Sequence, residues 1–170
     1  MDDRTDRLSG KVAEVVDSTD RVREAVEADI PRIVEMGMRS LRDGPYGEHI
    51  GANPEHGKAF AGDMVRGQNS IVLLYERGGR VEGLLAFIVF PHFFSGERTA
   101  QEIMWWVEPE ARKGSSFSRI PAFMLFREAE RLAKEMGAMQ MQFTAPTPAI
   151  GKLYERAGYR QIEIGYQRTL

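Results

Sequence analysis

The segment that decides the interpretation is Trp105-Trp106-Val107-Glu108-Pro109-Glu110-Ala111-Arg112-Lys113-Gly114-Ser115-Ser116. It starts as an apolar, buried strand, turns at Pro-Glu, and continues as a basic Gly/Ser loop before a long amphipathic helix. Backbone N–H groups of such a loop and of the first helical turn converge on one point, where the helix dipole is positive. We therefore predict an anion site suited to a pyrophosphate, although a solvated turn before a helix has a similar composition.

Composition limits the class of protein. The 170 residues suit one domain, and a net charge of −2 argues against a basic surface for nucleic acid. No apolar run approaches the ~18 residues of a membrane span, and the first residues lack the apolar core of a secretory signal. We expect a soluble, cytoplasmic protein. The absence of cysteine excludes disulfides, zinc sites with cysteine ligands and a thiol nucleophile.

Hydrophobic periodicity and capping residues predict the order of the elements. Residues 1–20 read as a flexible or helical arm, and residues 21–170 as a single domain. Within that domain, strands are expected at residues 22–26, 71–75, 81–90, 100–107 and 139–143, with one or two closing strands in 159–168. Helices are expected to begin at Asp29, Asn53, about Ser118 and Thr147 and to end near Leu41, Gly67, Gly137 and Gly158.

These elements predict an α/β (α+β) fold. The sheet is mixed and mostly antiparallel, with helices on both faces because the hairpin strands are apolar nearly throughout. The strand–helix–strand unit over residues 100–143 is long enough for a right-handed crossover, which makes one central parallel pair. In open α/β sheets, ligands usually bind where such strands diverge at their carboxyl ends.

Three segments carry a family resemblance: residues 102–110 with their Val-Glu-Pro-Glu exit, the loop of residues 112–116, and Leu-Tyr-Glu-Arg-Ala-Gly-Tyr at 153–159. In this order and spacing they resemble the GNAT superfamily of acyl-CoA-dependent N-acyltransferases, from about residue 22 onward. The chain also resembles the short, divergent members found in bacteriophages.

The resemblance implies an N-acetyltransferase that moves an acetyl group from acetyl-CoA to a primary amine by direct attack in a ternary complex, without a metal. The backbone of Trp105, Trp106 and Val107 would contact the pantetheine arm. The pyrophosphate loop would supply further cofactor contacts from Arg112, Lys113, Gly114, Ser115 and Ser116. Thr147, which stands about where the family has an asparagine, would supply another.

Two residues are candidates for proton transfer. Glu102 lies mid-strand, where the family often has a glutamate, and partial burial would raise its pKa towards that of a general base. The alternative is a glutamate on an exposed strand edge. By resemblance, Tyr154 would be the general acid for the CoA thiolate, but the same helix face also suits an ordinary core tyrosine.

Other observations leave the function open. Counted from Arg112, the loop glycine arrives one residue earlier than in the family, and Thr147 replaces the asparagine. A catalytically inactive GNAT-fold module that binds acyl-CoA or a protein partner is therefore the alternative. The histidines are too scattered for a metal site. The loop of residues 43–53, with His49, would cover the amine acceptor or form an ordinary surface loop, and exposed edge strands favour a homodimer.

Overall fold

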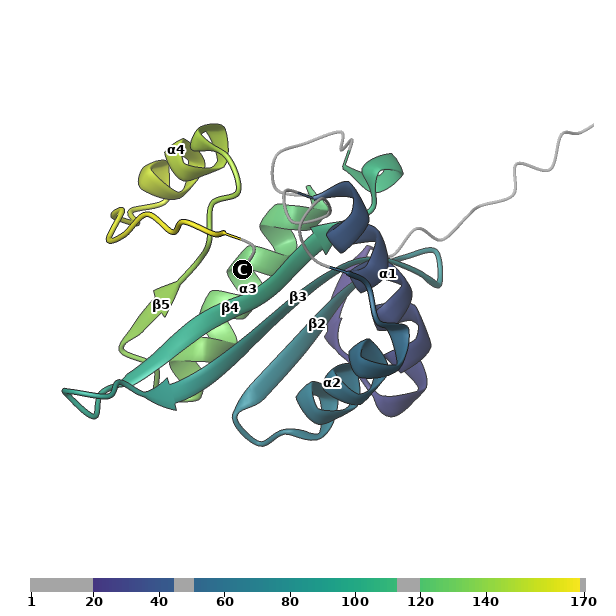
Figure 1. The fold of residues 1–170 in the computed structure, drawn as a ribbon, viewed down its shortest axis with the longest axis horizontal. Helices are drawn as coiled ribbons and strands as arrows, with labels where there is room; N and C mark the ends of the chain where they lie inside the picture. The colour runs from purple at the N-terminus through teal and green to yellow at the C-terminus, as the bar shows by residue number, and fades with distance from the viewer. Residues whose placement is uncertain (1–19, 45–50, 113–119, 169–170) are drawn as a thin grey trace, which may run out of the picture.

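The computed structural model describes residues 20–44, 51–112 and 120–168. In this part of the chain, five strands form one sheet in the order β1-β2-β3-β4-β5 (Figure 1). The first four strands pair antiparallel, and β4 and β5 pair parallel. The strands are β1 (Arg21–Glu24), β2 (Ser70–Arg77), β3 (Arg80–Pro91), β4 (Arg98–Val107) and β5 (Gln140–Gln142). The helices are α1 (Ile30–Asp43), α2 (Pro54–Arg66), α3 (Pro121–Glu135) and α4 (Pro148–Arg156), and 3-10 turns span Glu27–Asp29 and Pro109–Ala111.

Local sequence explains most element boundaries. Gly78 and Gly79 have φ values of 54° and 76°, which the tight turn between β2 and β3 requires. The side chain of Asn53 accepts a hydrogen bond from the His56 N–H at 3.1 Å and caps α2, as predicted. The prediction for Asp29 was wrong in detail. Its carboxylate accepts from the Val26 N–H at 2.8 Å, so it caps the 3-10 turn before α1 and not α1 itself.

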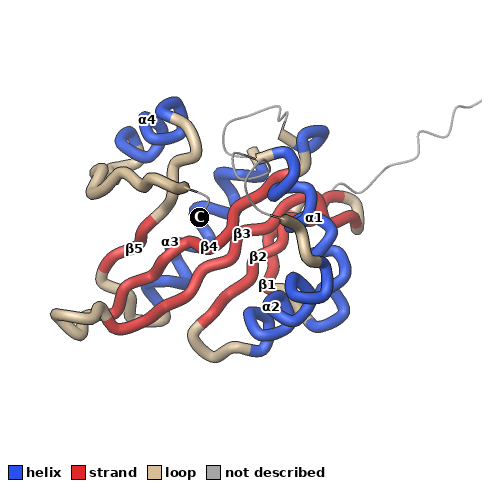
Figure 2. The backbone as a smooth tube through the Cα atoms, in the orientation of Figure 1, coloured by secondary structure: helices blue, strands red, loops and turns tan. Residues whose placement is uncertain are grey.

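Two apolar clusters lie between the sheet and the helices that flank it. Figure 2 shows α3 on one side of the sheet and α1 and α2 on the other. On one face, Phe87 and Tyr75 pack with Leu125 of α3. On the other, Leu84 and Trp106 pack under α1 and α2. The sheet is therefore covered by helices on both sides, and the predicted mixed, mostly antiparallel fold with one parallel pair is confirmed.

The predicted closing strands are wrong, because residues 159–168 form no strand. An alternating pattern makes a strand only where a partner edge accepts its hydrogen bonds. After Tyr159 the chain does not follow β5 (Figure 1), and Ile162, Ile164 and Tyr166 are 65%, 67% and 93% exposed. The parallel pair consequently lies at one edge of the described sheet, where we had expected it at the centre.

No helix in the described ranges is long and apolar enough to cross a membrane.

Candidate active site

The candidate site begins with an irregularity in β4. Phe87 pairs with Glu102 and the preceding Ala86 pairs with Met104, so Ile103 is an extra residue without a partner in β3. Such a bulge bends the strand and increases its twist. β5 pairs with β4 only along residues 99–101, immediately before the bulge. Past this point the two parallel strands diverge, and no described strand pairs with the outer edge of β4 over residues 102–107.

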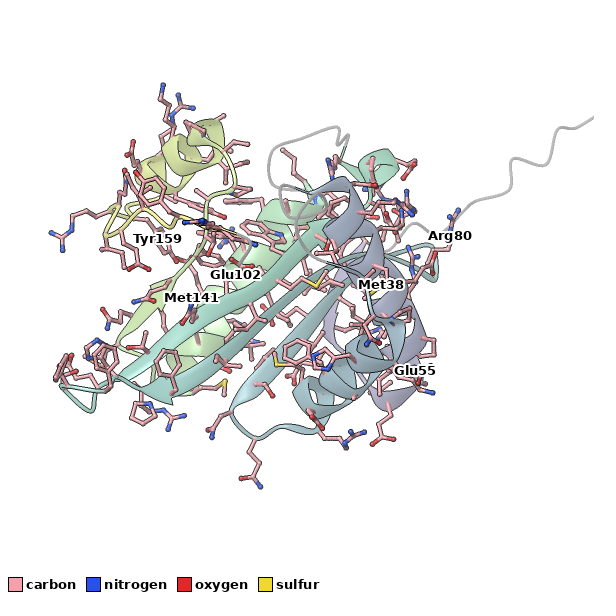
Figure 3. The ribbon with its side chains drawn as sticks, viewed as in Figure 1. Met38, Glu55, Arg80, Glu102, Met141 and Tyr159 are labelled. Carbon is pink, nitrogen blue, oxygen red and sulfur yellow. The ribbon has the colours of Figure 1, made fainter. Side chains whose placement is uncertain are left out.

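Glu102 lies where the strands diverge. Figure 3 shows it beside β4, on the side towards Tyr159 and the segment that follows α4. One carboxylate oxygen, Oε2, accepts a hydrogen bond from the backbone N–H of Thr144 at 3.1 Å. Burial raises the pKa of Glu102 above its ordinary value, and the Thr144 N–H lowers it by a smaller amount. The Glu102 side chain is thus partly buried, whereas the alternative interpretation expected it to be exposed at a strand edge.

Tyr154 approaches the same place from α4. Its hydroxyl donates to the carbonyl oxygen of Thr144 at 3.4 Å, so the peptide groups of one residue contact both proton-transfer candidates. Burial, and then the negative charge of Glu102, raise the pKa of the Tyr154 hydroxyl. The side chain is half-buried. The structure therefore brings together two residues that are 52 positions apart in the sequence.

A set of aromatic rings holds Tyr154 in position. The Trp105 ring lies 6.2 Å from the Tyr154 ring and 5.6 Å from the Phe143 ring, measured between centroids. Phe126 of α3 and Tyr159 contact the same rings. Offset and tilted ring pairs at these distances are favourable beyond their buried area. Trp105 thus belongs to the site side of the sheet, and Trp106, on the opposite face, belongs to the core.

Trp106 also anchors a charged cluster at the end of β4. Its indole Nε1 donates to the buried carboxylate of Glu108 at 3.2 Å. The same carboxylate pairs with Arg32 at 2.8 Å and Arg39 at 3.1 Å, both from α1. The Arg112 guanidinium lies over the Trp106 ring, 4.7 Å from its centroid. These contacts fasten the exit of β4 to α1 and fix where the loop after it begins.

The remaining predicted cofactor residues have mixed outcomes. Arg112 is exposed, but its Nε donates to the Val107 carbonyl at 2.9 Å, so one acceptor site of Val107 is already occupied. The Thr147 hydroxyl accepts from the Ile150 N–H at 3.4 Å and caps α4. The rest of the pyrophosphate loop, Lys113, Gly114, Ser115 and Ser116, lies outside the described residues, as does His49. The assignment of the loop to pyrophosphate therefore stays a prediction.

Sequence reasoning missed Thr144, Phe143 and Glu108. Thr144 acts through its backbone, which carries no sequence signal. Phe143 was assigned to a strand, and nothing in its spacing indicated that it would meet Tyr154. Glu108 was noted only as part of the Val-Glu-Pro-Glu exit, because a glutamate beside a turn is ordinarily solvent-exposed. Among the described residues, no group of three or more His, Asp or Glu side chains is arranged to hold a metal ion.

Comparisons with known proteins bear on the fold. No protein-family model and no curated protein sequence matches the chain. Among solved structures, a transcriptional regulator from Bacillus halodurans C-125 superposes with a TM-score of 0.69 at 21% identity, covering 89% of this chain and 99% of the regulator. A predicted acetyltransferase with acetyl-CoA from Clostridium acetobutylicum has a TM-score of 0.68 at 17% identity, with 88% and 96% covered.

An aminoglycoside acetyltransferase from an uncultured soil metagenomic sample, in complex with sisomicin, has a TM-score of 0.64 at 14% identity and covers 89% of this chain and 96% of its own. Identities this low establish the fold and not the reaction. The chain shares the GNAT-like fold of these structures. In this fold, Glu102 and Tyr154 lie where β4 and β5 diverge.

Proposed function

We propose that this protein is an acyltransferase that moves an acetyl group from acetyl-CoA to a primary amine by direct attack in a ternary complex. The observation that carries the proposal is the convergence of Glu102 and Tyr154 on the peptide groups of Thr144, at the point where β4 and β5 diverge. Thr144 thus holds a carboxylate and a hydroxyl close together beside an open strand edge. This arrangement suits a reaction in which one group removes a proton and another delivers one.

In this scheme the amine nitrogen attacks the thioester carbonyl carbon, the new C–N bond forms and the C–S bond breaks. Glu102 accepts the proton that the ammonium must lose, directly or through water. Burial supports this role, because a raised pKa makes the carboxylate a stronger base than an exposed one.

Tyr154 delivers the proton that the departing thiolate needs. A raised pKa keeps its hydroxyl protonated at working pH but also makes it a weak acid. The second cause of the shift is the charge of Glu102, and that charge disappears once Glu102 has accepted a proton. Tyr154 therefore becomes a stronger acid after the base has acted, which couples the two proton transfers in the required order.

Acetyl-CoA supplies the activated acyl group, and two features of the site suit it. The outer edge of β4 over residues 102–107 offers strand backbone groups that no described strand uses, and these can pair with the amides of pantetheine as an added strand would. Trp105 belongs to this edge, and its ring faces the rings of Phe143 and Tyr154. The loop of residues 112–116, from Arg112 to Ser116, is assigned to the pyrophosphate on its sequence, and Thr147 at the start of α4 is assigned to the cofactor by the resemblance.

Turnover by single variants tests the catalytic assignments. Glu102→Gln and Tyr154→Phe should each lower kcat about 10²- to 10⁴-fold with a panel of primary amines, while binding of acetyl-CoA stays nearly unchanged. Glu110→Gln and Tyr166→Phe remove the same groups from exposed positions and should leave kcat unaltered. The release of CoA can be followed with a thiol reagent, because the chain contains no cysteine to react in the background.

Calorimetric titration of acetyl-CoA separates catalysis from binding. The native protein should bind, and Gly114→Glu, which adds a carboxylate to the pyrophosphate loop, should not. Binding without turnover of any amine would favour the alternative of an inactive module that binds acyl-CoA. No binding at all would refute the proposal and favour a GNAT-fold module that binds a protein partner.

A further inference from the structure

Tyr154 and Tyr159 belong to one rigid body with α4. The Tyr159 N–H donates to the Tyr154 carbonyl at 3.0 Å. Gly158 adopts a φ of 91°, which ends the helix and turns the chain back onto its last turn. We call residues 148–159 the α4 unit, because the helix and both tyrosines have to move together.

The α4 unit rests on a floor of three rings. Trp105 of β4, Phe126 of α3 and Phe143 after β5 contact one another, with centroids 5.0 to 5.9 Å apart. The Tyr154 ring lies 5.5 Å from Phe143 and 6.2 Å from Trp105. The Tyr159 ring lies 5.5 Å from Phe143 and 5.7 Å from Phe126. The floor joins β4 to the segment that follows β5, so the α4 unit lies across the place where the two strands diverge.

The fastening of the α4 unit is light. Figure 1 shows α4 set apart from the other helices. The unit contains no buried residue, so lifting it exposes little more than the rings themselves. Two hydrogen bonds accompany the ring contacts. The Tyr159 hydroxyl donates to Glu130 at 2.9 Å, and the Tyr154 hydroxyl donates to the Thr144 carbonyl at 3.4 Å, well above the usual length of an O–H···O bond.

One short segment connects the α4 unit to the sheet. The Thr144 N–H donates to Glu102 at 3.1 Å, which fixes the start of this connection. The connection then contains Pro146 and leads into Pro148, and neither has an N–H for a backbone hydrogen bond. On the far side of the unit, residues 160–168 are all exposed. A rotation within the connection therefore lifts the α4 unit from its floor while the sheet stays folded.

We propose that the α4 unit is a latch, which lifts from the ring floor to admit the acyl donor and then closes on it. The inference rests on the proposed function. A donor that pairs with the outer edge of β4 runs about 4.8 Å from that strand, beside Trp105. The Tyr154 ring is stacked there on Trp105, with 19° between the planes, and no chain passes between two rings in contact. On closing, the Tyr154 hydroxyl exchanges its long bond to the Thr144 carbonyl for the thioester sulfur.

A latch makes the association rate of the donor proportional to the fraction of molecules in which the latch is open. Contacts that hold the α4 unit closed should therefore slow association, although they do not touch the donor. A permanently packed aromatic core would show no such link between the opening of α4 and the rate of binding.

Amide hydrogen exchange of the native chain without ligand tests the opening itself. The N–H groups of α4 and of Tyr159 should exchange with one common protection factor, far below that of β2 and β3, because the α4 unit opens by itself. Exchange of α4 only together with β2 and β3 would overturn the latch.

Stopped-flow association of acetyl-CoA tests the gating. Tyr159→Phe removes the bond to Glu130, so it should raise the association rate constant by the same factor by which it accelerates amide exchange in α4. Tyr166→Phe makes the same change at a position that is 93% exposed and should alter neither quantity. Faster exchange in the Tyr159→Phe protein with an unchanged association rate would contradict the proposal.

A staple should reverse the effect within a single protein. The side chains of Glu130 and Tyr159 meet end to end, so Glu130→Cys combined with Tyr159→Cys places two thiols that a short bismaleimide can join. The native chain has no cysteine to compete. The double variant should bind acetyl-CoA faster than the native protein before stapling and far more slowly afterwards. Gln101→Cys stapled to Gln142→Cys, on paired residues before the divergence, is the control and should leave association unchanged.

The outcomes separate this inference from the proposed function. If acetyl-CoA binds to the native protein and the Glu130–Tyr159 staple does not slow its association, the latch is refuted and the proposed function stands. If neither the native protein nor any variant binds acetyl-CoA, the proposed function is refuted and the gating with it.

Discussion

Two regions of this molecule are built differently. The sheet from β1 to β4 with α1, α2, α3 and the turn of residues 108–111, which we call the block, contains every buried residue among those that the structure describes. The segment from residue 138 to 168, which we call the arm, consists of β5, α4 and the tail of residues 160–168. It contains no buried residue. α4 is held mainly through the rings of Tyr154 and Tyr159.

The candidate site lies where these regions meet. Glu102 belongs to the block, Tyr154 belongs to the arm, and Thr144 at the junction contacts both. A catalytic group on a strand of a packed sheet is fixed by many neighbours, whereas one on a thinly packed helix depends on a few ring contacts. The difference teaches that Glu102, the proposed general base, is preorganised by the fold, and that the position of Tyr154, the proposed general acid, depends on the stability of the arm.

The largest expected effect is on the free energy of unfolding, when a buried phenylalanine and an exposed one are each replaced by alanine. Phe87 is fully buried in the block, and Phe60, of the same size, is 47% exposed on α2. Phe87→Ala should lower the free energy of unfolding by about 3–5 kcal/mol, because it leaves a cavity between β3 and α3. Phe60→Ala should lower it far less. Urea denaturation of both variants measures the difference, and equal losses would contradict the assigned packing.

The next effect concerns the charged cluster within the block, where the exit of β4 meets α1. Glu108→Ala should destabilise the protein by about 2–3 kcal/mol, because the loss of the buried carboxylate leaves Arg32, Arg39 and the Trp106 indole without their shared acceptor. Both arginines are partly exposed, which keeps the loss below that of a fully buried pair. Glu110→Ala, at an exposed position 3.9 Å from Arg39, is the matched control and should change stability little. Similar thermal midpoints for the two variants would show that the cluster is not structural.

A smaller effect should be confined to the arm. Tyr159→Phe removes the hydrogen bond to Glu130 and should cost about 1 kcal/mol. The loss should appear in amide hydrogen exchange as faster exchange in α4, with β2 and β3 unchanged, because the arm opens without the block. Tyr166→Phe serves as the control from the exposed tail. Faster exchange throughout the sheet would mean that the arm and the block unfold together.

The smallest effect is a pH dependence. Burial raises the pKa of Glu102 above its unfolded value, so the folded protein holds a proton that the unfolded chain releases between these two pKa values. The stability contributed by Glu102 is present below the unfolded pKa and is lost as pH rises through the folded pKa. Glu102→Gln cannot titrate, so the stability of the native protein should fall relative to the variant as pH rises from the unfolded pKa of about 4 through the raised folded pKa. An opposite slope would mean that the carboxylate is stabilised in its charged form.

Local sequence rules predicted the block well. Gly78-Gly79 fixed the hairpin, Asn53-Pro54 fixed the start of α2, and continuous apolar runs marked strands covered on both faces. In the arm, the same rules predicted closing strands over residues 159–168 that the structure does not have. Ile162, Ile164 and Tyr166 alternate as in a strand, but alternation reports only that one face is apolar and not whether an edge is present to pair with it.

The sequence by itself determined the element order as far as α4 and the two-sided sheet, because periodicity, caps and turns act over a few residues. The family resemblance, together with the place of Glu102 in its strand, made Glu102 and Tyr154 the candidates. Tertiary structure alone decided that the bulge falls at Ile103, that β5 leaves β4 after Gln101, and that Thr144 joins the two candidates. These features depend on the register of strands that are distant in sequence and on backbone groups that every residue possesses. No pattern of side chains encodes them locally.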